Sequence, residues 1–365
     1  VVVAMSGGVD SSVAAALLLR QGYEVVGCFL RLGSPQGVEE PQTCSPTGGR
    51  NKQGCCSVLD ADDARRVAGV LGIPLYVLNF QEDFGRVIDY FVGEYNAGRT
   101  PNPCVRCNDW LKFGKLAKYA EAVGADYIAT GHYARRGVDP QTNMPLLLRG
   151  RDHRKDQSYV LFGMRPEVLE RTLLPIGELE KPAVRAMAEQ WGLPVFSKPD
   201  SQEICFVPNQ DYAALVRRRT PEAFGQGRFV DADGQTLGTH EGHQHYTIGQ
   251  RKGVRLALGR PVYVTAIDPS TNTVTLGQRQ DLDRRTLLAA QANYLHPASC
   301  GARQMRCVAK IRYNHEPQPA EMSDLGDGRI EIRFDVPQSA ITPGQAVVAY
   351  LDDVLLAGAW IERAT

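Results

Sequence analysis

Residues 1–12 read VVVAMSGGVDSS, and this stretch predicts both the fold and the kind of ligand. Val1–Met5 is an apolar, β-branched run of the kind that forms a buried strand. Ser6-Gly7-Gly8-Val9-Asp10-Ser11-Ser12 follows directly and opens a predicted helix over 12–20. The two glycines let backbone N–H groups turn towards an anion without a Cβ atom in the way, and the helix N-terminus adds partial positive charge. The stretch therefore predicts a phosphate-binding loop.

The sequence of this loop also limits which reactions it can support. It lacks the Gly-Lys-Ser/Thr ending of a Walker A motif, which disfavours γ-phosphoryl transfer in the manner of P-loop enzymes. Asp10 is a candidate ligand for Mg²⁺ beside the phosphates. The alternative interpretation is an ordinary helix N-terminus capped by Ser and Asp side chains. The order of strand, loop and helix favours the phosphate loop.

The first half of the chain repeats this pattern of strand and amphipathic helix. Strands are predicted at 1–5, 24–32, 75–79 and 127–130, and helices at 12–20, 59–71, 84–95, 111–123 and 182–191. Such alternation is typical of βαβ units around a parallel sheet, so we predict a doubly wound, Rossmann-like α/β domain. Residues 33–54 interrupt the pattern with Gly, Pro, Ser and Gln and are predicted to form a surface loop.

After about residue 208, short alternating segments separated by turn residues replace the helices. Strands are predicted at 228–230, 262–267, 274–276, 305–313, 329–334 and 346–351, and the region as a whole is predicted to be antiparallel. The predicted architecture is an α/β nucleotide-binding domain over 1–207, a small central domain over 208–272 and an antiparallel β-barrel over 273–365.

The composition excludes several classes of protein. The chain has 365 residues, 43% of them hydrophobic, which excludes a single small module and wholesale disorder. Its 41 Lys and Arg residues balance 41 Asp and Glu residues, so a polyanion would have to be recognised by a local basic face. We expect a soluble, cytoplasmic protein without a membrane span or leader. Nine cysteines, an odd number, favour reduced thiols over a secreted disulfide framework.

Five further motifs follow the phosphate loop. They are NPCVRCN (102–108), TGHY (130–133), KDQSY (155–159), SQEICF (201–206) and YTIGQRKG (246–253). The loop resembles that of the PP-loop ATP pyrophosphatase superfamily, and the ordered set resembles the tRNA-specific 2-thiouridylase family. The resemblance spans most of the chain and implies a PP-loop domain, a central tRNA-binding domain and a β-barrel.

The resemblance implies ATP-dependent insertion of sulfur at C2 of uridine 34, the wobble position of certain tRNAs. ATP would adenylate the C2 oxygen with release of pyrophosphate, and sulfur would then displace AMP. A relay protein or a cysteine desulfurase would donate the sulfur. The residues that match the ATP site of the family are Ala4, Met5, Ser6, Gly7, Gly8, Val9, Asp10 and Ser11, together with Leu30 and Gly131.

Two cysteines in the matched motifs are candidates for sulfur chemistry, which requires a thiolate or a persulfide. By resemblance, Cys205 carries the persulfide and Cys107 is the nucleophile that resolves it, leaving a disulfide between them to be reduced. An isolated cysteine is more often a small buried hydrophobic residue, but the motif context favours chemistry here. Cys55 and Cys56 are interpreted as capping or packing residues.

Cys104 stands where many members of the family have Asp, which removes a carboxylate acid/base from this position. It also creates Cys104-x-x-Cys107, which with Cys205 could supply three thiolates to a [4Fe-4S] cluster with one open iron, as in some related thiolation enzymes. A zinc site and a cysteine that simply replaces Asp are further alternatives. The persulfide relay and the cluster both stay open at this point.

RNA contacts must come from local features because the net charge is zero. Basic candidates are Arg149, Arg151, Arg154, Lys155, Arg217 to Arg219, Arg251, Lys252, Lys310 and Arg312. The resemblance favours Lys155, Asp156, Gln157, Arg312, Tyr313 and Gln345 as tRNA contacts, and Asn102, Pro103, Cys104 and His132 near the target base. We expect Tyr313 to stack on an unpaired base and the target uridine to be flipped out.

Two other classes of protein remain alternatives. A PP-loop ligase that forms amides would need an ammonia source, and no glutaminase-like region is evident in the sequence. A non-catalytic RNA-binding protein with a decayed nucleotide fold would not be expected to keep an intact phosphate loop together with Cys107 and Cys205.

Overall fold

The computed structural model describes residues 1–33, 58–200, 204–207, 211–256 and 258–365. Cys44, Cys55, Cys56 and nearly all of the predicted surface loop therefore lie outside the described residues. The chain forms two compact units, which are described separately. Unit 1 comprises Val1–Val87, Cys104–Gln210 and Asp353–Leu355, and unit 2 comprises Ile88–Pro103, Asp211–Asp352 and Leu356–Thr365.

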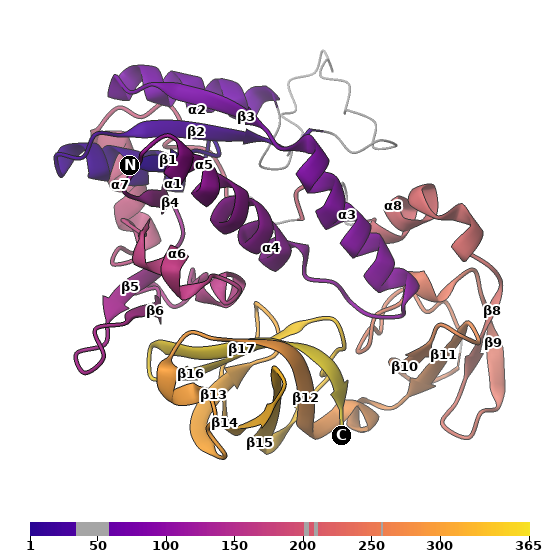
Figure 1. Cartoon of the computed structure of the whole chain (residues 1–365). Helices are drawn as coiled ribbons and strands as arrows, with labels where there is room; N and C mark the ends of the chain where they lie inside the picture. Colours follow the sequence, from indigo (N-terminus) through magenta and orange to yellow (C-terminus); the bar gives the residue numbers. More distant parts are fainter. Residues whose placement is uncertain (34–57, 201–203, 208–210, 257) are drawn as a thin grey trace, which may run out of the picture. The chain divides into compact units, whose positions relative to one another are not determined.

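Unit 1 is built on a parallel sheet with the strand order β3-β2-β1-β4-β7 (Figure 1). The strands are β1 (Val2–Ala4), β2 (Val26–Arg31), β3 (Leu75–Asn79), β4 (Ile128–Thr130) and β7 (Thr172–Leu173). The predicted doubly wound sheet is confirmed. The order reverses at β1, because β2 and β3 lie on one side of it and β4 on the other. Ligands of such sheets bind at the carboxyl ends of the strands beside this switch point.

Helices α1 (Val9–Arg20), α2 (Val58–Leu71) and α7 (Lys181–Gln190) share one hydrophobic core with this sheet, in which Val3, Val13 and Val184 are fully buried. The remaining helices include α3 (Gln81–Asn96), α4 (Pro103–Arg106), a π-helix (Cys107–Lys115), α5 (Leu116–Ala122) and α6 (Pro166–Glu170). The hairpin of β5 (Ala134–Val138) and β6 (Pro145–Arg149) was not predicted.

No helix within the described ranges is long and apolar enough to cross a membrane.

The central part of unit 2 contains α8 (Tyr212–Arg219) and a sheet with the order β10-β11-β8-β9. Its strands are β8 (Gly227–Val230), β9 (Thr236–His240), β10 (Tyr263–Asp268) and β11 (Thr273–Gly277). The prediction of a purely antiparallel region was wrong here, because β8 and β11 pair in parallel, with Arg228 beside Thr273. The long connection through β9 and β10 allows this pairing, since parallel neighbours need a crossover that tight turns cannot provide.

The C-terminal part of unit 2 is a closed antiparallel barrel. Its strands are β12 (Asp283–Tyr294), β13 (Met305–Lys310), β14 (Gln318–Gly326), β15 (Arg329–Ser339), β16 (Ala346–Leu351) and β17 (Val354–Ala364). They run in the order β12-β15-β14-β13-β16-β17, and pairing of β12 with β17 closes the barrel. Inward-facing residues such as Ile332, Met322 and Ala359 are fully buried. The predicted C-terminal β-barrel is confirmed.

Candidate nucleotide site

The loop between β1 and α1 is folded around its serine hydroxyls. The Ser6 N–H donates to Ser11 Oγ at 3.2 Å, and the hydroxyls of Ser11 and Ser12 donate to the Gly8 carbonyl at 3.2 and 2.7 Å. Gly7 has a φ of +70°, and a Cβ atom there would lie 2.1 Å from the Asp60 carbonyl oxygen. Only glycine fits this position, so the sequence dictates a loop that turns at the carboxyl end of β1 and runs into a helix N-terminus. This geometry suits a phosphate group.

Gly131 packs against the same loop from the neighbouring strand. It follows β4, which lies parallel to β1, and a Cβ atom on it would lie 2.5 Å from Ser11 N and 2.6 Å from the Asp10 carbonyl carbon. The structure thus brings Gly131 together with the phosphate loop, as the family pattern implied. Leu30 lies near the carboxyl end of β2 and is buried. Met5 and Val9 are buried in the core beneath the loop.

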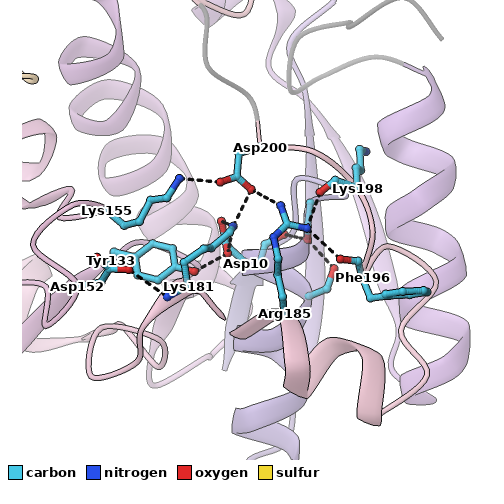
Figure 2. Close-up of polar contacts among 12 residues, drawn as sticks. Asp10, Tyr133, Asp152, Lys155, Lys181, Arg185, Phe196, Lys198 and Asp200 are labelled. Carbon is cyan, nitrogen blue, oxygen red and sulfur yellow. Dashed lines mark hydrogen bonds and ion pairs between the residues drawn. The ribbon is translucent and has the colours of Figure 1, made fainter. Parts of the chain in front are cut away.

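Asp10 makes its ion pair with a lysine that the sequence analysis did not single out. The Lys181 ammonium, at the first turn of α7, lies 2.7 and 2.8 Å from the two carboxylate oxygens of Asp10 (Figure 2). The Tyr133 hydroxyl donates to the same carboxylate at 2.8 Å. Burial, followed by the charge of Asp10, raises the pKa of Tyr133. Asp10 is therefore held by a cation and a hydroxyl beside the loop.

Asp200 joins this pair to two further cations. Its carboxylate lies 2.8 Å from the Lys181 ammonium, 2.8 Å from Lys155 Nζ and 2.7 Å from the Arg185 guanidinium (Figure 2). Burial alone would raise the pKa of Asp200, but the hydrogen bonds and charges of Lys155 and Lys181 lower it to about 2. Asp200 is thus ionised at neutral pH. Lys155, a predicted tRNA contact, is tied by this carboxylate to the phosphate loop.

The two residues after Lys155 have internal partners. Asp156 is buried and accepts hydrogen bonds from the backbone N–H groups of Gly150 and Ser158, both at 3.0 Å. The Gln157 side-chain oxygen accepts from the Tyr133 N–H at 3.0 Å. These contacts fix the KDQSY segment against the strand end that carries Gly131 and Tyr133. A direct tRNA contact by Asp156 or Gln157 stays a prediction.

His132 is buried beside the nucleotide site. Its Nδ1 atom lies 2.8 Å from the Thr130 hydroxyl, and its ring lies 6.0 Å from the Phe113 ring. Burial, helped by the charge of Lys112, lowers the pKa of His132 well below its ordinary value. The imidazole is therefore neutral at physiological pH.

The cysteines predicted to handle sulfur lie in unit 1. Cys104 is exposed, whereas Cys107 and Cys205 are half-buried. Cys107 begins the π-helix, and Lys115 at the other end of that helix pairs with Asp83 in the first turn of α3. Phe206, next to Cys205, packs edge-on against Phe84 in that same turn, with ring centroids 5.5 Å apart. The start of α3 thus contacts both cysteine-bearing segments.

No group of three His, Cys, Asp or Glu side chains in the described part of the chain is arranged to hold a metal ion. Cys104, Cys107 and Cys205 are all described residues, so the structure does not gather them into ligands for a cluster or for zinc.

The remaining predicted tRNA contacts lie in unit 2. The Gln345 amide donates to the carbonyls of Thr100 and Pro101 at 3.2 and 2.9 Å, and Asn102, which follows them, is buried. Gln345 therefore supports the segment that leads into the NPCVRCN motif. Arg312 is exposed, and Tyr313 keeps 37% of its surface exposed with the Lys310 ammonium 5.8 Å from its ring.

Sequence reasoning missed the charged residues that surround the loop, namely Asp60, Lys181, Arg185, Lys198 and Asp200. Lys181 and Asp10 are 171 positions apart, and no local pattern links them. The one available signal was the position of Asp200 directly before the SQEICF motif.

Comparison with protein families gives a consistent assignment of each part. Residues 1–209 match the family described as the tRNA methyl transferase HUP domain, residues 214–278 its PRC-barrel domain, and residues 284–361 the aminomethyltransferase beta-barrel domain. The fold and the loop therefore define a protein with a HUP-type nucleotide domain followed by two β modules.

Full-length relatives identify the particular family. The chain is 50% identical over 364 residues to a tRNA-specific 2-thiouridylase of Carboxydothermus hydrogenoformans, covering 100% of this chain and 97% of the relative. It is 50% identical over 361 residues to that of Moorella thermoacetica, covering 99% and 98%. It is 46% identical over 386 residues to that of Rhodopirellula baltica, covering 100% and 96%. The chain belongs to the tRNA-specific 2-thiouridylase family.

Proposed function

We propose that this protein is a tRNA-uridine 2-sulfurtransferase that uses ATP to replace the C2 oxygen of uridine 34 with sulfur. The observation that carries the proposal is the full-length relationship to proteins named tRNA-specific 2-thiouridylase. The phosphate loop supports the ATP requirement, because a turn with Gly7 and Gly8 at a helix N-terminus suits a polyphosphate.

In the first step, the loop binds the phosphates of ATP, and Gly131 lets the chain after β4 pack against the backbone of Asp10 and Ser11 in that loop. The uridine C2 oxygen attacks the α-phosphate, and pyrophosphate leaves. Lys181 is suited to stabilise the negative charge that develops on the phosphates, because its buried ammonium lies beside the loop at Asp10. The product is a uridine adenylate whose AMP group is a good leaving group.

In the second step, Cys205 carries a persulfide delivered by a donor protein. The Cys107 thiolate attacks the inner sulfur of that persulfide, forms a Cys107–Cys205 disulfide and releases hydrosulfide with its electron pair. The hydrosulfide attacks C2 and AMP leaves, which yields 2-thiouridine. A thiol reductant then restores both cysteines.

A [4Fe-4S] cluster on Cys104, Cys107 and Cys205 is the second candidate mechanism, and Cys104 is the feature that favours it. The described residues form no three-ligand group, so we assign no step to a cluster. We also assign no step to protein-bound Mg²⁺, since both Asp10 oxygens contact the Lys181 ammonium. The magnesium that accompanies ATP would be held by phosphate oxygens.

The test is formation of 2-thiouridine at position 34, measured by nucleoside mass spectrometry with ATP. Metal-stripped and iron-reconstituted protein are compared under anaerobic conditions, each with a persulfide donor and with sulfide. We expect stripped protein to work with the persulfide and the Cys205→Ser and Cys107→Ser variants to be inactive. The Cys300→Ser variant, which removes an exposed thiol of the barrel, is the matched control and should stay active.

Two outcomes would contradict the proposal. Activity that requires iron reconstitution would replace the relay with the cluster mechanism. Exchange of ATP with pyrophosphate that depends on a small carboxylic acid, and not on tRNA, would assign the protein to the amide-forming ligases.

A further inference from the structure

Lys198 contacts the phosphate loop through the backbone of the loop. Its ammonium donates to the Gly7 carbonyl oxygen at 2.9 Å. The same ammonium lies 2.6 Å from a carboxylate oxygen of Asp60 and 2.6 Å from one of Asp63, both in the first turns of α2. One lysine therefore links the turn of the loop to a neighbouring helix.

The charge of Lys198 is already balanced by these two carboxylates. Burial lowers the pKa of Lys198, but the hydrogen bonds to Asp60 and Asp63 outweigh it and raise the pKa above its ordinary value. Lys198 therefore stays protonated and keeps its contact with Gly7 at neutral pH. The same ammonium also donates to the Gly7 carbonyl, so Lys198 is well suited to hold the loop.

Holding the Gly7 carbonyl fixes the direction of the next N–H group. The Gly7 carbonyl and the Gly8 N–H belong to one planar trans peptide, in which they point in opposite directions. Gly7 cannot rotate freely, because it packs against the Asp60 carbonyl oxygen. With its carbonyl bound to Lys198, the Gly8 N–H at the N-cap of α1 points the other way, away from Lys198.

The backbone of Lys198 is itself held by α7. The Arg185 guanidinium donates to the carbonyls of Phe196 and Lys198, both at 3.0 Å, and to the Asp200 carboxylate at 2.7 Å (Figure 2). The short segment 196–200 thus places Lys198 in contact with Gly7 at one end of the loop. At the other end, Asp200 of the same segment contacts Lys181, which binds Asp10.

We propose that Lys198 is a positioning residue for ATP, which orients the Gly7–Gly8 peptide so that the Gly8 N–H donates to a phosphate oxygen. This inference rests on the proposed role of the loop as the ATP phosphate site. The contacts that carry this role are those of Lys198 with Gly7, Asp60 and Asp63, all within the protein. Lys198 acts through the backbone of Gly7, so its loss should weaken recognition of phosphate groups and spare recognition of the adenosine part.

The test compares Lys198→Met with Lys198→Arg in tRNA-dependent exchange between ATP and pyrophosphate, using the full chain. We expect Lys198→Met to raise the KM for ATP and the KM for inorganic pyrophosphate, the second substrate of the exchange, about tenfold, with the inhibition constant of adenosine unchanged. Lys198→Arg keeps a charged donor and should recover most of the affinity. The matched control is Arg66→Met, since Arg66 also pairs with Asp63 but is exposed and has no contact with Gly7 among its described partners.

If Lys198 had only a structural role, its loss would change all three constants by the same factor or would change only the melting temperature. Either result would overturn the inference. An unchanged KM for ATP in Lys198→Met would overturn it as well. If Lys198→Met does not fold, Lys198→Gln, which is polar but removes the ammonium, must show a loss of affinity in the same direction, confined to the phosphate groups. Absence of exchange in the unaltered protein would instead refute the proposed function, so the two failures are distinguishable.

Discussion

Asp200 pairs with three cations that come from different parts of unit 1: Lys155 from the KDQSY motif, and Lys181 and Arg185 from α7. Together with Asp10, the cluster contains three positive and two negative side chains. An excess of positive charge beside a helix N-terminus favours an anion, since the two fields add. These five side chains carry one net positive charge, which supports the proposed phosphate site.

A prediction at this scale concerns His132. Because burial and then Lys112 lower its pKa, the folded protein holds a neutral ring while the unfolded chain is protonated below about pH 6.5. Its contribution to stability is thus present above about pH 6.5 and is lost as the pH falls towards the folded pKa. We expect the ¹³C resonance of the His132 ring, assigned with His132→Gln, to stay at its neutral position from pH 8 to 6. A midpoint near 6.5 would show that the ring is accessible to solvent.

Individual site residues could be predicted only where a local motif marks them. Ser6 to Ser11 could be proposed because glycines and hydroxyls cluster directly after a strand, whereas Gly131 was named only through the resemblance of the TGHY motif. Lys181, Lys198 and Asp200 were missed because a single charged residue usually lies on a solvated surface, and nothing in its neighbourhood records a partner across the fold. Side-chain burial, which Lys181 has at 9% exposure, is a property of the tertiary structure alone.

Among the elements, the end of β4 and the start of α1 lie in close contact at the candidate nucleotide site. The two strands β1 and β4 are adjacent at the switch point, so the residue after β4 faces the backbone of Asp10 and Ser11. A side chain at this position has no flexible neighbour to displace. It must move the backbone of the phosphate loop.

We therefore predict that Gly131→Ala raises the KM for ATP at least about tenfold and destabilises the protein by about 1–3 kcal/mol, as overpacking against a fixed backbone does. The measurements are exchange kinetics and denaturant unfolding. Gly69→Ala in α2 is the control, because a Cβ atom there meets no atom within 4 Å and alanine favours a helix. If both variants bind ATP normally, Gly131 does not form a wall of the site.

Helices and strands with a regular pattern of apolar side chains could be predicted from the sequence. Elements that form only through pairing with neighbouring segments could not. Strand β7 has two residues, and β12 begins Asp-Arg-Arg and ends Gln-Ala-Asn-Tyr around a short Thr-Leu-Leu-Ala-Ala run, so neither carries a regular alternating pattern. The predicted helix over 111–123 exists, but its first part belongs to a π-helix that starts at Cys107. Side-chain periodicity does not distinguish a π-helix from an α-helix over so short a stretch, and such segments occur often at functional sites.

At the scale of the whole molecule, the balanced charge decides how tRNA can be bound. With 41 positive and 41 negative side chains, no long-range field attracts the polyanion, so affinity must come from a few local cations. Many arginines are already paired within the fold, as Arg306 is with Asp335. Contacts to tRNA should therefore depend on exposed cations such as Arg312. Such residues can be identified from the sequence together with their exposure in the structure, but not from the net charge of the chain.

Each phosphate contact releases counterions, so removing one should make tRNA binding less dependent on salt. We predict that Arg312→Ala weakens tRNA binding and reduces the slope of log K against log salt by about one, with ATP affinity unchanged. The measurement is a tRNA titration at several salt concentrations. Arg306→Ala is the matched control in the same barrel, because its guanidinium binds Asp335 through two hydrogen bonds of 2.8 and 2.7 Å and has less freedom to bind phosphate. Equal slopes for Arg312→Ala and the unaltered protein would remove Arg312 from the tRNA interface and direct the search to Arg251 and Lys252, which are also exposed.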